Sequence, residues 1–349
     1  MAADGVLSFG NDATAIAAAR SGVALADRTH WDRIWVRDGD RLKFLHNQTT
    51  NDFRQLSPGQ GCETVFVTAT ARTLDLASAY VLDDAVLLQV SPGQGEALMK
   101  FCDRYIFFDD TVKLALATET LACFTLIGPD SHRLIEQLTG KNLSTQLAYS
   151  HQVRLCAGIE VRIASGSDLA LPGYNLFCEA ESAAALWQVI LDASLDKTVG
   201  PVGPVVAMGA IAWEQLRIQQ GRPAVGQELT EDYNPLEAGL WQTISFDKGC
   251  YIGQETIARL NTYNGVKQRL FGLQLDGPAK PGSMLKAGEE KVGKITSVVE
   301  TPDGVMALAY LRTKIGGEGL IVSVGEASDR LPRGCTGTAV PLAYVKHPT

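Results

Sequence analysis

The stretch Phe246-Asp-Lys-Gly-Cys-Tyr-Ile-Gly-Gln-Glu255 places a thiol between a cation and an expected helix start. Lys248 precedes Cys250 by two positions, and the residues from Gly253 through Leu260 predict a helix. A cation and the unpaired N–H groups of a helix N-terminus both favour the thiolate form of a cysteine. The stretch therefore predicts a reactive Cys250. The alternative is a cysteine that only fills apolar space.

The neighbours of Cys250 fit the same interpretation. Lys248 is expected to favour the thiolate, and Gly249 and Gly253 allow a close approach of the backbone. Gln254 and Glu255 fall in the first turn of the expected helix. They either contact a ligand or simply cap the helix and compensate its dipole, and the sequence leaves both alternatives open.

The residues Lys248-Gly-Cys-Tyr-Ile-Gly-Gln-Glu255 resemble the signature of the folate-binding YgfZ family. These proteins are relatives of the glycine-cleavage T-protein (aminomethyltransferase) and are implicated in iron–sulfur cluster maintenance. Further segments agree with the family in order and spacing. They are Phe44-Leu-His-Asn-Gln-Thr-Thr-Asn-Asp52, Trp213-Glu-Gln-Leu-Arg-Ile-Gln-Gln-Gly221, Asn234-Pro-Leu-Glu-Ala-Gly-Leu240 and Val292-Gly-Lys-Ile-Thr-Ser-Val-Val-Glu-Thr-Pro-Asp-Gly304.

The resemblance implies an α+β fold of the T-protein type, with three subdomains around a central channel and a C-terminal β-barrel. Residues 1–262 are expected to form the folate-binding, aminomethyltransferase-like region from two interleaved subdomains, and residues 265–347 the barrel. The residues themselves favour the barrel. After Gly265 the chain consists of short β-type runs separated by turn pairs such as Pro281-Gly282.

The resemblance also implies the ligand and the residues that contact it. In the T-protein relatives, tetrahydrofolate or a one-carbon derivative is held by the segment that matches Asn47 to Asp52 and by the loop that matches Ala71 to Leu76. The implied binding residues are Asn47, Thr49, Thr50, Asn51, Arg72, Gln219, Tyr251, Gln254, Glu255 and Arg259.

Gln219 departs from the family pattern. An acid in the motif Arg-Leu-Glu-Ala-Gly grips the pterin ring in the relatives, because a carboxylate accepts two parallel N–H bonds from its amidine-like edge. The matching segment here is Arg217-Ile-Gln-Gln-Gly221. Glutamine accepts one bond and donates another, and each lost charge-assisted bond costs about 1.5–3 kcal/mol. The folate species and its affinity are therefore expected to differ from those of the T-protein.

Asp75 is the second departure. The T-protein loop carries adjacent acids, whereas Ala71-Arg-Thr-Leu-Asp-Leu76 keeps only Asp75. It is either a catalytic residue beside Cys250 and Lys248 or the cap of a turn. The true aminomethyltransferases also commonly carry an acid at the position of Cys250. This difference and the loss of the adjacent acids in the loop both favour the accessory, iron–sulfur-linked branch.

Charge limits the classes of partner. The chain has 349 residues, 46% of them hydrophobic, and a net charge of −8. This charge argues against bulk binding of nucleic acid or of an anionic membrane. The segment Met1 to Asp27 has neither the pattern of a secretory signal nor that of a transit peptide, so a cytoplasmic protein is expected.

The cysteines are scattered through the chain. No two have the Cys-x-x-Cys spacing of zinc sites or of common iron–sulfur ligand runs, so no stably bound metal or cluster is expected. Iron–sulfur client or assembly proteins would then be transient partners. The seven cysteines are Cys62, Cys102, Cys123, Cys156, Cys178, Cys250 and Cys335.

Three basic residues lie at the end of the expected helix and after it. Arg259, Lys267 and Arg269 form a strip that suits the glutamate tail of a folate; exposed charges that keep the protein soluble are the competing interpretation.

Upstream, the periodicity predicts a helix from Val205 to Gln219 and another from Pro129 to Leu138.

These observations predict a tetrahydrofolate-binding accessory protein that supports iron–sulfur cluster assembly or repair, including in enzymes that modify tRNA, through a folate channel and a reactive cysteine. Two alternatives stay open. One is an aminomethyltransferase of the glycine-cleavage type, a folate-dependent one-carbon transferase, and the other is a scaffold without catalysis.

Overall fold

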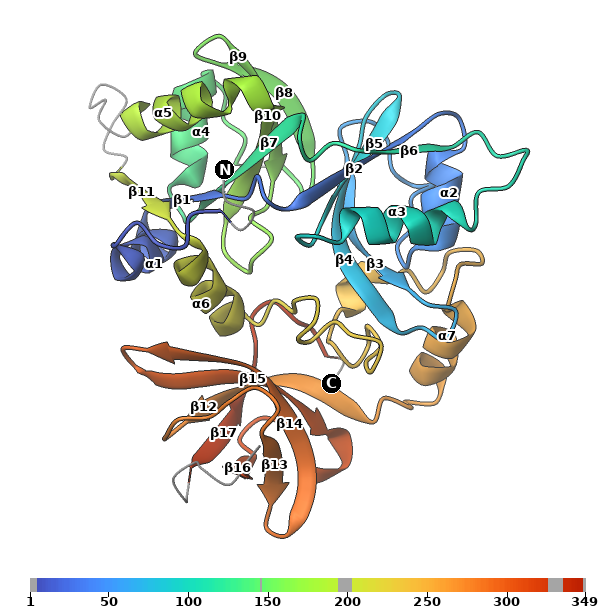
Figure 1. Cartoon of the computed structure of the whole chain (residues 1–349), viewed down its shortest axis with the longest axis vertical. Helices are drawn as coiled ribbons and strands as arrows, with labels where there is room; N and C mark the ends of the chain where they lie inside the picture. Colours follow the sequence, from blue (N-terminus) through green and yellow to red (C-terminus); the bar gives the residue numbers. More distant parts are fainter. Residues whose placement is uncertain (1–4, 145, 194–202, 326–334, 348–349) are drawn as a thin grey trace. The chain divides into compact units, whose positions relative to one another are not determined.

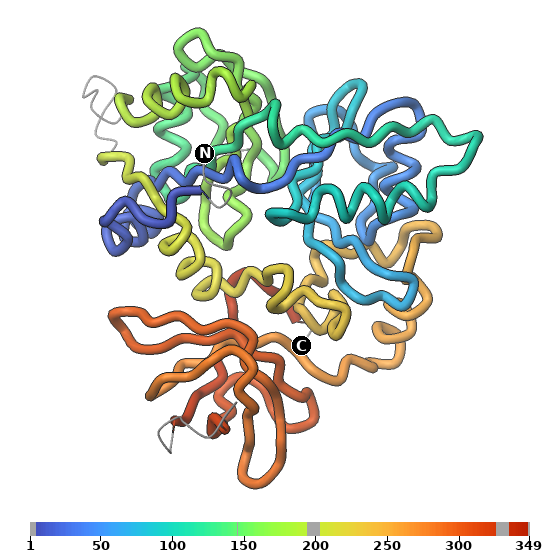
Figure 2. Tube along the Cα trace, viewed as in Figure 1, coloured from blue at the N-terminus to red at the C-terminus, as the bar shows by residue number. Residues whose placement is uncertain are grey.

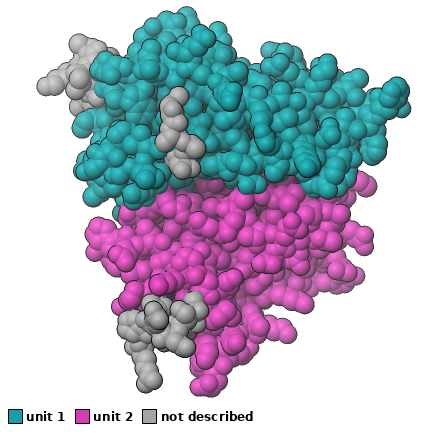
Figure 3. Space-filling view, viewed as in Figure 1, with its two compact units in different colours: residues 1–46, 52–64, 77–213 teal, residues 47–51, 65–76, 214–349 magenta. Residues whose placement is uncertain are grey.

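The computed structural model describes residues 5–144, 146–193, 203–325 and 335–347. The chain divides into two compact units, coloured separately in Figure 3. Unit 1 contains Met1–His46, Asp52–Thr64 and Ala77–Trp213, and unit 2 contains Asn47–Asn51, Val65–Leu76 and Glu214–Thr349. The predicted domain ranges 1–262 and 265–347 both include stretches outside the described residues, namely 1–4, 145, 194–202 and 326–334.

Unit 1 contains a six-stranded sheet in the order β11-β1-β7-β10-β9-β8 (Figure 1). β1 pairs in parallel with β11, and the other neighbours pair antiparallel. The strands are β1 (Val23–Asp27), β7 (Leu121–Ile127), β8 (His151–Cys156), β9 (Ile159–Ser165), β10 (Gly173–Glu179) and β11 (Val205–Met208).

Helices α4 (Ser131–Thr139) and α5 (Ala183–Ala193) cover this sheet and pack against each other. Their apolar faces supply Leu134, Ile135, Leu186 and Ile190, all fully buried against strand residues of the sheet. The predicted helix from Pro129 to Leu138 is thus confirmed as α4. It ends at Gly140, whose left-handed φ of 67° is a conformation that glycine adopts without steric cost. The short helix η1 (Ala180–Ser182) precedes α5, and α1 (Asp12–Ser21) packs on β1 and β11.

The second sheet has the order β3-β4-β5-β2-β6, and α3 packs on β2 and β6. Within unit 1 it meets the first sheet at an edge-to-face contact of Tyr80 with Phe177, whose ring centroids lie 5.3 Å apart. The elements are β2 (Asp32–Arg37), α2 (Arg41–Gln48), β3 (Gly61–Val67), β4 (Thr73–Val81), β5 (Ala85–Val90), α3 (Gly95–Asp103) and β6 (Lys113–Leu116).

Unit 2 contains a closed barrel in the order β12-β15-β14-β13-β16-β17, which confirms the predicted C-terminal β-barrel. Its interior is filled by aliphatic side chains such as Leu273, Val292 and Leu311. The strands are β12 (Gln268–Leu275), β13 (Met284–Ala287), β14 (Glu290–Thr301), β15 (Gly304–Arg312), β16 (Ile321–Val324) and β17 (Thr336–Val340), with the short helix η3 (Thr313–Ile315) after β15.

The segment Val65–Leu76 packs against a second apolar cluster of unit 2 although it lies far from the barrel in sequence. Val65, Val67 and Leu76 share this cluster with Tyr233 and Tyr310. The two tyrosine rings are stacked with centroids 3.6 Å apart. In Figure 2 the light-blue turn of residues 65–76 runs beside the yellow segment that follows α6. Buried aromatic area of this kind contributes strongly to packing.

Helix α6 (Ala210–Gln220) is tied to the barrel by Arg217. The guanidinium is 2% exposed and donates to both oxygens of Glu214, to Glu228 at 2.9 Å and to the Oγ of Ser297 on β14 at 2.9 Å. Removing one member of such a buried charged cluster leaves the others without compensation. We interpret this cluster as structural.

Two local predictions were wrong. The predicted helix from Val205 to Gln219 begins only at Ala210, because its first residues form β11 and pair with β1. Gly209 separates the strand from the helix at a point where a Cβ atom would lie 2.5 Å from the carbonyl oxygen of Leu7. The expected loop from Ala71 to Leu76 is shorter than predicted, since β4 already begins at Thr73.

The longest described α-helices, α5 and α6, have 11 residues each. Among the residues that the structure describes, no helix has both the length and the apolar character needed to cross a membrane.

Candidate functional site

Lys248 fixes the loop of residues 244–253, here called the Cys250 loop, to the segment Asn47–Asn51 within unit 2. Its ammonium donates to the main-chain oxygens of Thr49 at 2.8 Å and of Asn51 at 2.6 Å, and it lies 4.6 Å from the ring centroid of Tyr251. The side chain is 7% exposed. A buried ammonium needs such partners, because an unpaired charge is costly to bury. The cation next to Cys250 therefore holds two distant segments together.

Main-chain bonds extend this junction. The N–H of Ile252 donates to the carbonyl oxygen of Asn47 at 3.0 Å. The hydroxyl of Thr50 donates to the carbonyl oxygen of Thr243 at 2.8 Å and accepts the N–H of Val65 at 2.9 Å. Thr50 is fully buried. Asn47, Thr49, Thr50 and Asn51, predicted as ligand contacts, thus support the Cys250 loop through their main-chain oxygens.

Gly253 brings the start of α7 (Gln254–Thr262) against the turn before β4. Its φ of 81° lies in the left-handed region, and a Cβ atom there would lie 2.9 Å from the carbonyl oxygen of Thr68 and 3.1 Å from the Cα of Ala71. Only glycine adopts this φ without strain and also leaves room for the close approach of the Thr68–Ala71 backbone. The motif therefore needs Gly253 for backbone packing, as the sequence predicted.

Cys250 is the one exposed thiol among the described residues. Cys102 and Cys123 are buried, and burial raises the pKa of each to about 12. Burial also raises the pKa of Cys156 and of Cys178 to about 11. Because the thiolate is the reactive form, these four groups are poor nucleophiles at neutral pH. Solvent can reach Cys250 four positions before α7 begins.

The other predicted residues of the motif differ in exposure. Tyr251 is buried in an apolar cluster with Ala71 and Ile257, and burial raises the pKa of its phenol to about 12. Gln254 is half-buried and opens α7, and Glu255 is exposed in its first turn. The first-turn positions of Gln254 and Glu255 agree with the sequence prediction.

The structure places Asp75 and Gln219 on regular elements of unit 2. Asp75 is fully buried in β4, and its Oδ1 accepts the N–H of Leu76 at 2.8 Å. The interpretation of Asp75 as a turn cap is therefore wrong, since its backbone is that of a strand. Gln219 is half-buried near the end of α6.

A cleft follows one face of α7. Thr256, Arg259, Leu260 and Tyr263 line it with the spacing i, i+3, i+4 and i+7 that puts side chains on one helix face. Thr70 and Arg72 line its other wall, and its volume is 460 Å³. The cleft therefore begins at the turn of residues 68–72, on which the backbone of Gly253 packs.

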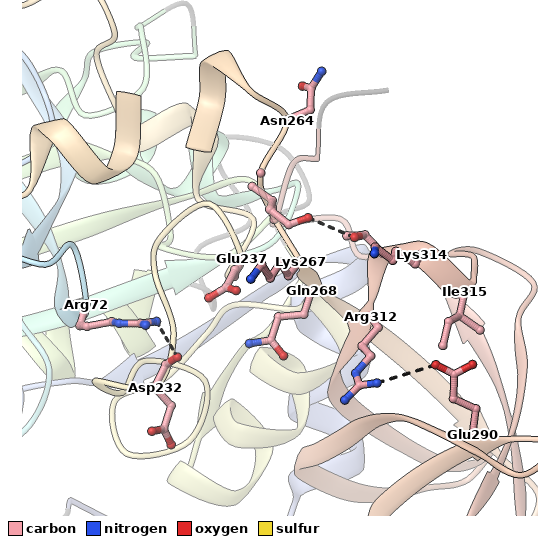
Figure 4. Close-up of a pocket in the computed structure, with 13 residues that line it drawn as sticks. Arg72, Asp232, Glu237, Asn264, Lys267, Gln268, Glu290, Arg312, Lys314 and Ile315 are labelled. Atoms are coloured by element: carbon pink, nitrogen blue, oxygen red, sulfur yellow. Dashed lines mark hydrogen bonds and ion pairs between the residues drawn. The ribbon is translucent and has the colours of Figure 1, made fainter. Parts of the chain in front are cut away.

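A second, larger cleft of 910 Å³ continues from it and shares Arg72, Glu237, Gly265 and Lys267 with the first (Figure 4). Gln268, Arg312 and Lys314 add polar and cationic groups from the barrel side. The guanidinium of Arg72 donates to the main-chain oxygen of Asp232 at 2.9 Å, as Figure 4 shows. Both volumes fall within the range of small-molecule sites, about 300–1,000 Å³.

Glu237 lies between the cations of the two clefts. Its Oε2 accepts the N–H of Asn234, and the Oδ1 of Asn234 accepts the N–H of Glu237, so the two side chains form a reciprocal cap. Burial raises the pKa of the Glu237 carboxyl, opposed by its hydrogen bonds and by the charges of Arg72 and Lys267. The cap explains why an acid is found in a cationic cleft.

The expected basic strip is rearranged. Arg259 and Lys267 line the clefts, whereas Arg269 is not among the lining residues. Gln268 of β12 faces the cleft, and consecutive strand residues point to opposite sides. Arg312 and Lys314 take the place of Arg269. Arg312 and Lys314 were missed because they lie more than 40 positions downstream of the strip. For the helix side of the cleft, the i, i+3, i+7 spacing of Thr256, Arg259 and Tyr263 was the available signal.

Within the described ranges, no group of three or more His, Cys, Asp or Glu side chains is arranged to hold a metal ion. The two clefts are lined by three guanidinium, two ammonium and three amide groups, together with the carboxylates of Asp232, Glu237 and Glu290. The cationic groups can bind carboxylates and phosphates, and the amides can hydrogen-bond to a heterocycle.

Comparison with known proteins identifies relatives across most of the chain. Residues 9–248 match the family model described as the GCVT N-terminal domain. A provisionally named chloroplastic transferase of Arabidopsis thaliana is 42% identical over 326 residues, which cover 93% of this chain and 73% of that protein. An aminomethyltransferase of Geobacillus thermodenitrificans is 29% identical over 336 residues, covering 94% of this chain and 88% of the relative.

Among solved structures, the glycine cleavage system aminomethyltransferase T of Bartonella henselae superposes with a TM-score of 0.81. The alignment covers 98% of this chain and 91% of that protein at 19% sequence identity. This likeness shows the fold. The prediction of a T-protein-like α+β fold with a C-terminal barrel is thus confirmed.

Proposed function

The chain belongs to the GCVT N-terminal domain family, and from this membership we infer that it binds a reduced folate in unit 2. The observation that most strongly supports this inference is the junction made by Lys248. It joins the Cys250 loop to Asn47–Asn51, and Gly253 joins the same loop to the turn at Ala71. Three segments that the sequence resemblance assigns to folate binding thus meet in one unit.

The residues of unit 2 fit a ligand of this class. A folate carries a polar heterocycle, an aromatic spacer and carboxylates. The clefts beside the Cys250 loop have the volume of a small-molecule site and are lined by Arg72, Arg259 and Lys267. These cations suit the carboxylates, whereas Gln219 suits a neutral heterocycle, to which it can donate one hydrogen bond and from which it can accept another.

Within the family we propose that this chain is an accessory protein of the YgfZ type, which supports iron–sulfur cluster assembly or repair. Cys250 supports this assignment, because its thiol is exposed beside the junction while Cys102, Cys123 and Cys178 are buried. An exposed thiol can meet the cluster or the cysteine of a partner protein transiently. Asp75, fully buried in β4, is the companion acid in this proposal.

Cells that lack the native protein provide the functional test. Expression of the wild-type chain should restore the activity of iron–sulfur enzymes, including those that modify tRNA. The Cys250→Ser variant should fold but fail to restore that activity, and Cys178→Ser, a buried control, should restore it. Full activity with Cys250→Ser would refute the role of the thiol.

An aminomethyltransferase is the second candidate, and the Geobacillus relative named as such favours it. This reaction needs a lipoyl carrier protein that presents an aminomethyl group. Formation of methylene-tetrahydrofolate by the purified chain with such a carrier would establish this candidate. Folate binding without turnover would favour the accessory role.

A further inference from the structure

Unit 1 contains a cavity of 340 Å³ that the proposed folate site does not use. Its lining residues come from the N-terminus of α4, the end of β7, the end of β9 and the start of β10 (Figure 1). They fall between Gly128 and Tyr174, inside the range Ala77–Trp213 of unit 1. The cavity therefore shares no lining residue with the two clefts of unit 2.

Main-chain hydrogen bonds fix the walls of this cavity. The N–H of Gly128 donates to the carbonyl oxygen of Pro172 at 2.8 Å. On the facing wall, the N–H of Gly166 donates to the carbonyl oxygen of Gly173 at 2.9 Å. A Cβ atom built on Gly166 would have no heavy atom within 4 Å, so the space beside this residue is open. The walls belong to the regular fold of the sheet, and the cavity exists without a ligand.

Ser131 is the first residue of α4 and lines the cavity. The residue is 1% exposed, and among the described residues its Oγ has no hydrogen-bond partner. A hydroxyl that is buried without a partner is costly, and native folds leave few such groups. A ligand in the cavity would supply the missing partner.

The N-terminus of α4 adds a partial positive charge. The helix has nine residues, and the aligned peptide dipoles of a helix attract anions to its N-terminus. The N–H groups of Ser131 and Arg133 already have main-chain acceptors at 3.1 Å, so the helix contributes mainly through this dipole. Asp130, the N-cap residue, makes no capping hydrogen bond with its side chain. Its carboxylate pairs instead with Arg133 at 3.3 Å.

The other polar side chains of the lining suit an anion. Ser165 at the end of β9 brings a hydroxyl, and burial raises the pKa of the Tyr174 phenol, which therefore keeps its proton. The Nδ1 of His132 donates to the carbonyl oxygen of Pro129 at 2.7 Å, which fixes the ring. Of the described residues that line the cavity, none is Asp, Glu, Lys or Arg. No carboxylate of the lining would therefore repel an anion.

We propose that this cavity binds the phosphate monoester of a small organic molecule, with the phosphate at the N-terminus of α4 and one of its oxygens accepting the hydroxyl of Ser131. A phosphate monoester carries about two negative charges near neutral pH and offers several acceptor oxygens. The volume of 340 Å³ lies at the lower end of the range of small-molecule sites, so a phosphate with a small organic group fits. The site is independent of the proposed folate binding.

Calorimetric titration of the full-length protein with glycerol 3-phosphate, inorganic phosphate and glycerol tests the site. We expect saturable binding of the two phosphates and no binding of glycerol at the same concentrations. Hydrogen exchange should slow in α4 and in the residues from Gly166 to Tyr174 when glycerol 3-phosphate is bound. Vesicles that contain phosphatidic acid present the same phosphate on a lipid, and we expect them not to compete with glycerol 3-phosphate.

Ser131→Ala should weaken the binding of glycerol 3-phosphate about tenfold, because a hydrogen bond to a charged group is lost. The matched control is Ser21→Ala, at an exposed position of α1 in the same unit that does not line the cavity, and it should keep the wild-type affinity. Asp130→Asn should tighten binding roughly threefold, since it removes a negative charge beside the helix start.

Four results would overturn the proposal. They are no saturable binding of either phosphate, equal affinity of a folded Ser131→Ala variant and the wild type, binding of glycerol as tight as that of its phosphate, and binding only of the phosphatidic acid vesicles. The third result would assign the cavity to neutral polyols, and the fourth would assign the phosphate to a lipid surface. Because the cavity lies in unit 1, each of these results leaves the proposed folate binding in unit 2 unaffected.

Discussion

The ammonium of Lys248 lies 2.6 Å from the main-chain oxygen of Asn51, 197 positions earlier in the chain. A second bond reaches Thr49 at 2.8 Å. A hydrogen bond from a charged ammonium to a main-chain oxygen is strong, and the loss of such a bond in a buried position is costly. The residue that the sequence analysis assigned to thiolate activation therefore also has a structural task.

Replacing Lys248 by Ala should lower the free energy of unfolding by about 3 kcal/mol, because two hydrogen bonds from a charged donor disappear. Urea unfolding of the two proteins measures the difference. The control is Lys280→Ala at an exposed position, which should change stability by less than about 0.5 kcal/mol. Equal stability of Lys248→Ala and the wild type would contradict the structural role.

Gly253→Ala should destabilise the protein more than Gly282→Ala. Both glycines have left-handed φ angles, 81° and 90°, so both substitutions bring backbone strain. A Cβ at Gly253 also meets the main-chain oxygen of Thr68, whereas a Cβ at Gly282 has no atom within 4 Å. Overpacking of this kind adds about 1–3 kcal/mol. Equal losses in thermal unfolding would mean that the Gly253 backbone is not packed against that turn.

Cys250 should be alkylated before the other cysteines at pH 7. Cys102, Cys123, Cys156 and Cys178 are buried with raised pKa values, so each needs an opening of the fold to react. Peptide mapping after a brief exposure to a maleimide identifies the modified residue. Labelling of Cys62 or Cys335 ahead of Cys250 would show that exposure does not select this thiol.

The stability of unit 1 should depend on pH through His151. Burial, together with the nearby Arg162, lowers the pKa of this imidazole to about 4. Its Nε2 donates to the carbonyl oxygen of Val81 at 3.0 Å, and its Nδ1 accepts from Arg162 at 3.0 Å. These two hydrogen bonds therefore stabilise the neutral form of the His151 ring in the folded protein.

Because the folded-state pKa lies below the unfolded value of about 6.5, the contribution of His151 is complete above pH 6.5 and is lost as the pH falls towards 4. The loss is on the order of 2–3 kcal/mol. His151→Gln should flatten the stability profile in this window, since glutamine does not titrate there; His132→Gln, at a half-buried position of the same unit, is the control. A profile that keeps its slope in His151→Gln would assign the pH dependence to other groups.

The sequence located the Cys250 loop because its motif is local. The glycines and the expected start of α7 lie within ten residues, and the structure agrees with them. The β-barrel could also be predicted, since turn pairs separate its strands regularly.

The clefts could not be predicted, because Arg72, Glu237 and Lys314 come together only through tertiary packing. The strand Val205–Met208 was missed for a similar reason. Its apolar run fits a helix or a strand equally well, and pairing with β1 decides between them.

Equilibrium titration of the purified wild-type protein with 5-formyl-tetrahydrofolate tests folate binding most directly. We predict saturable binding with one folate per chain, and protection of the Cys250 loop and α7 from hydrogen exchange in the bound state. The absence of saturable binding, or protection confined to residues remote from Lys248 and Arg72, would contradict the account.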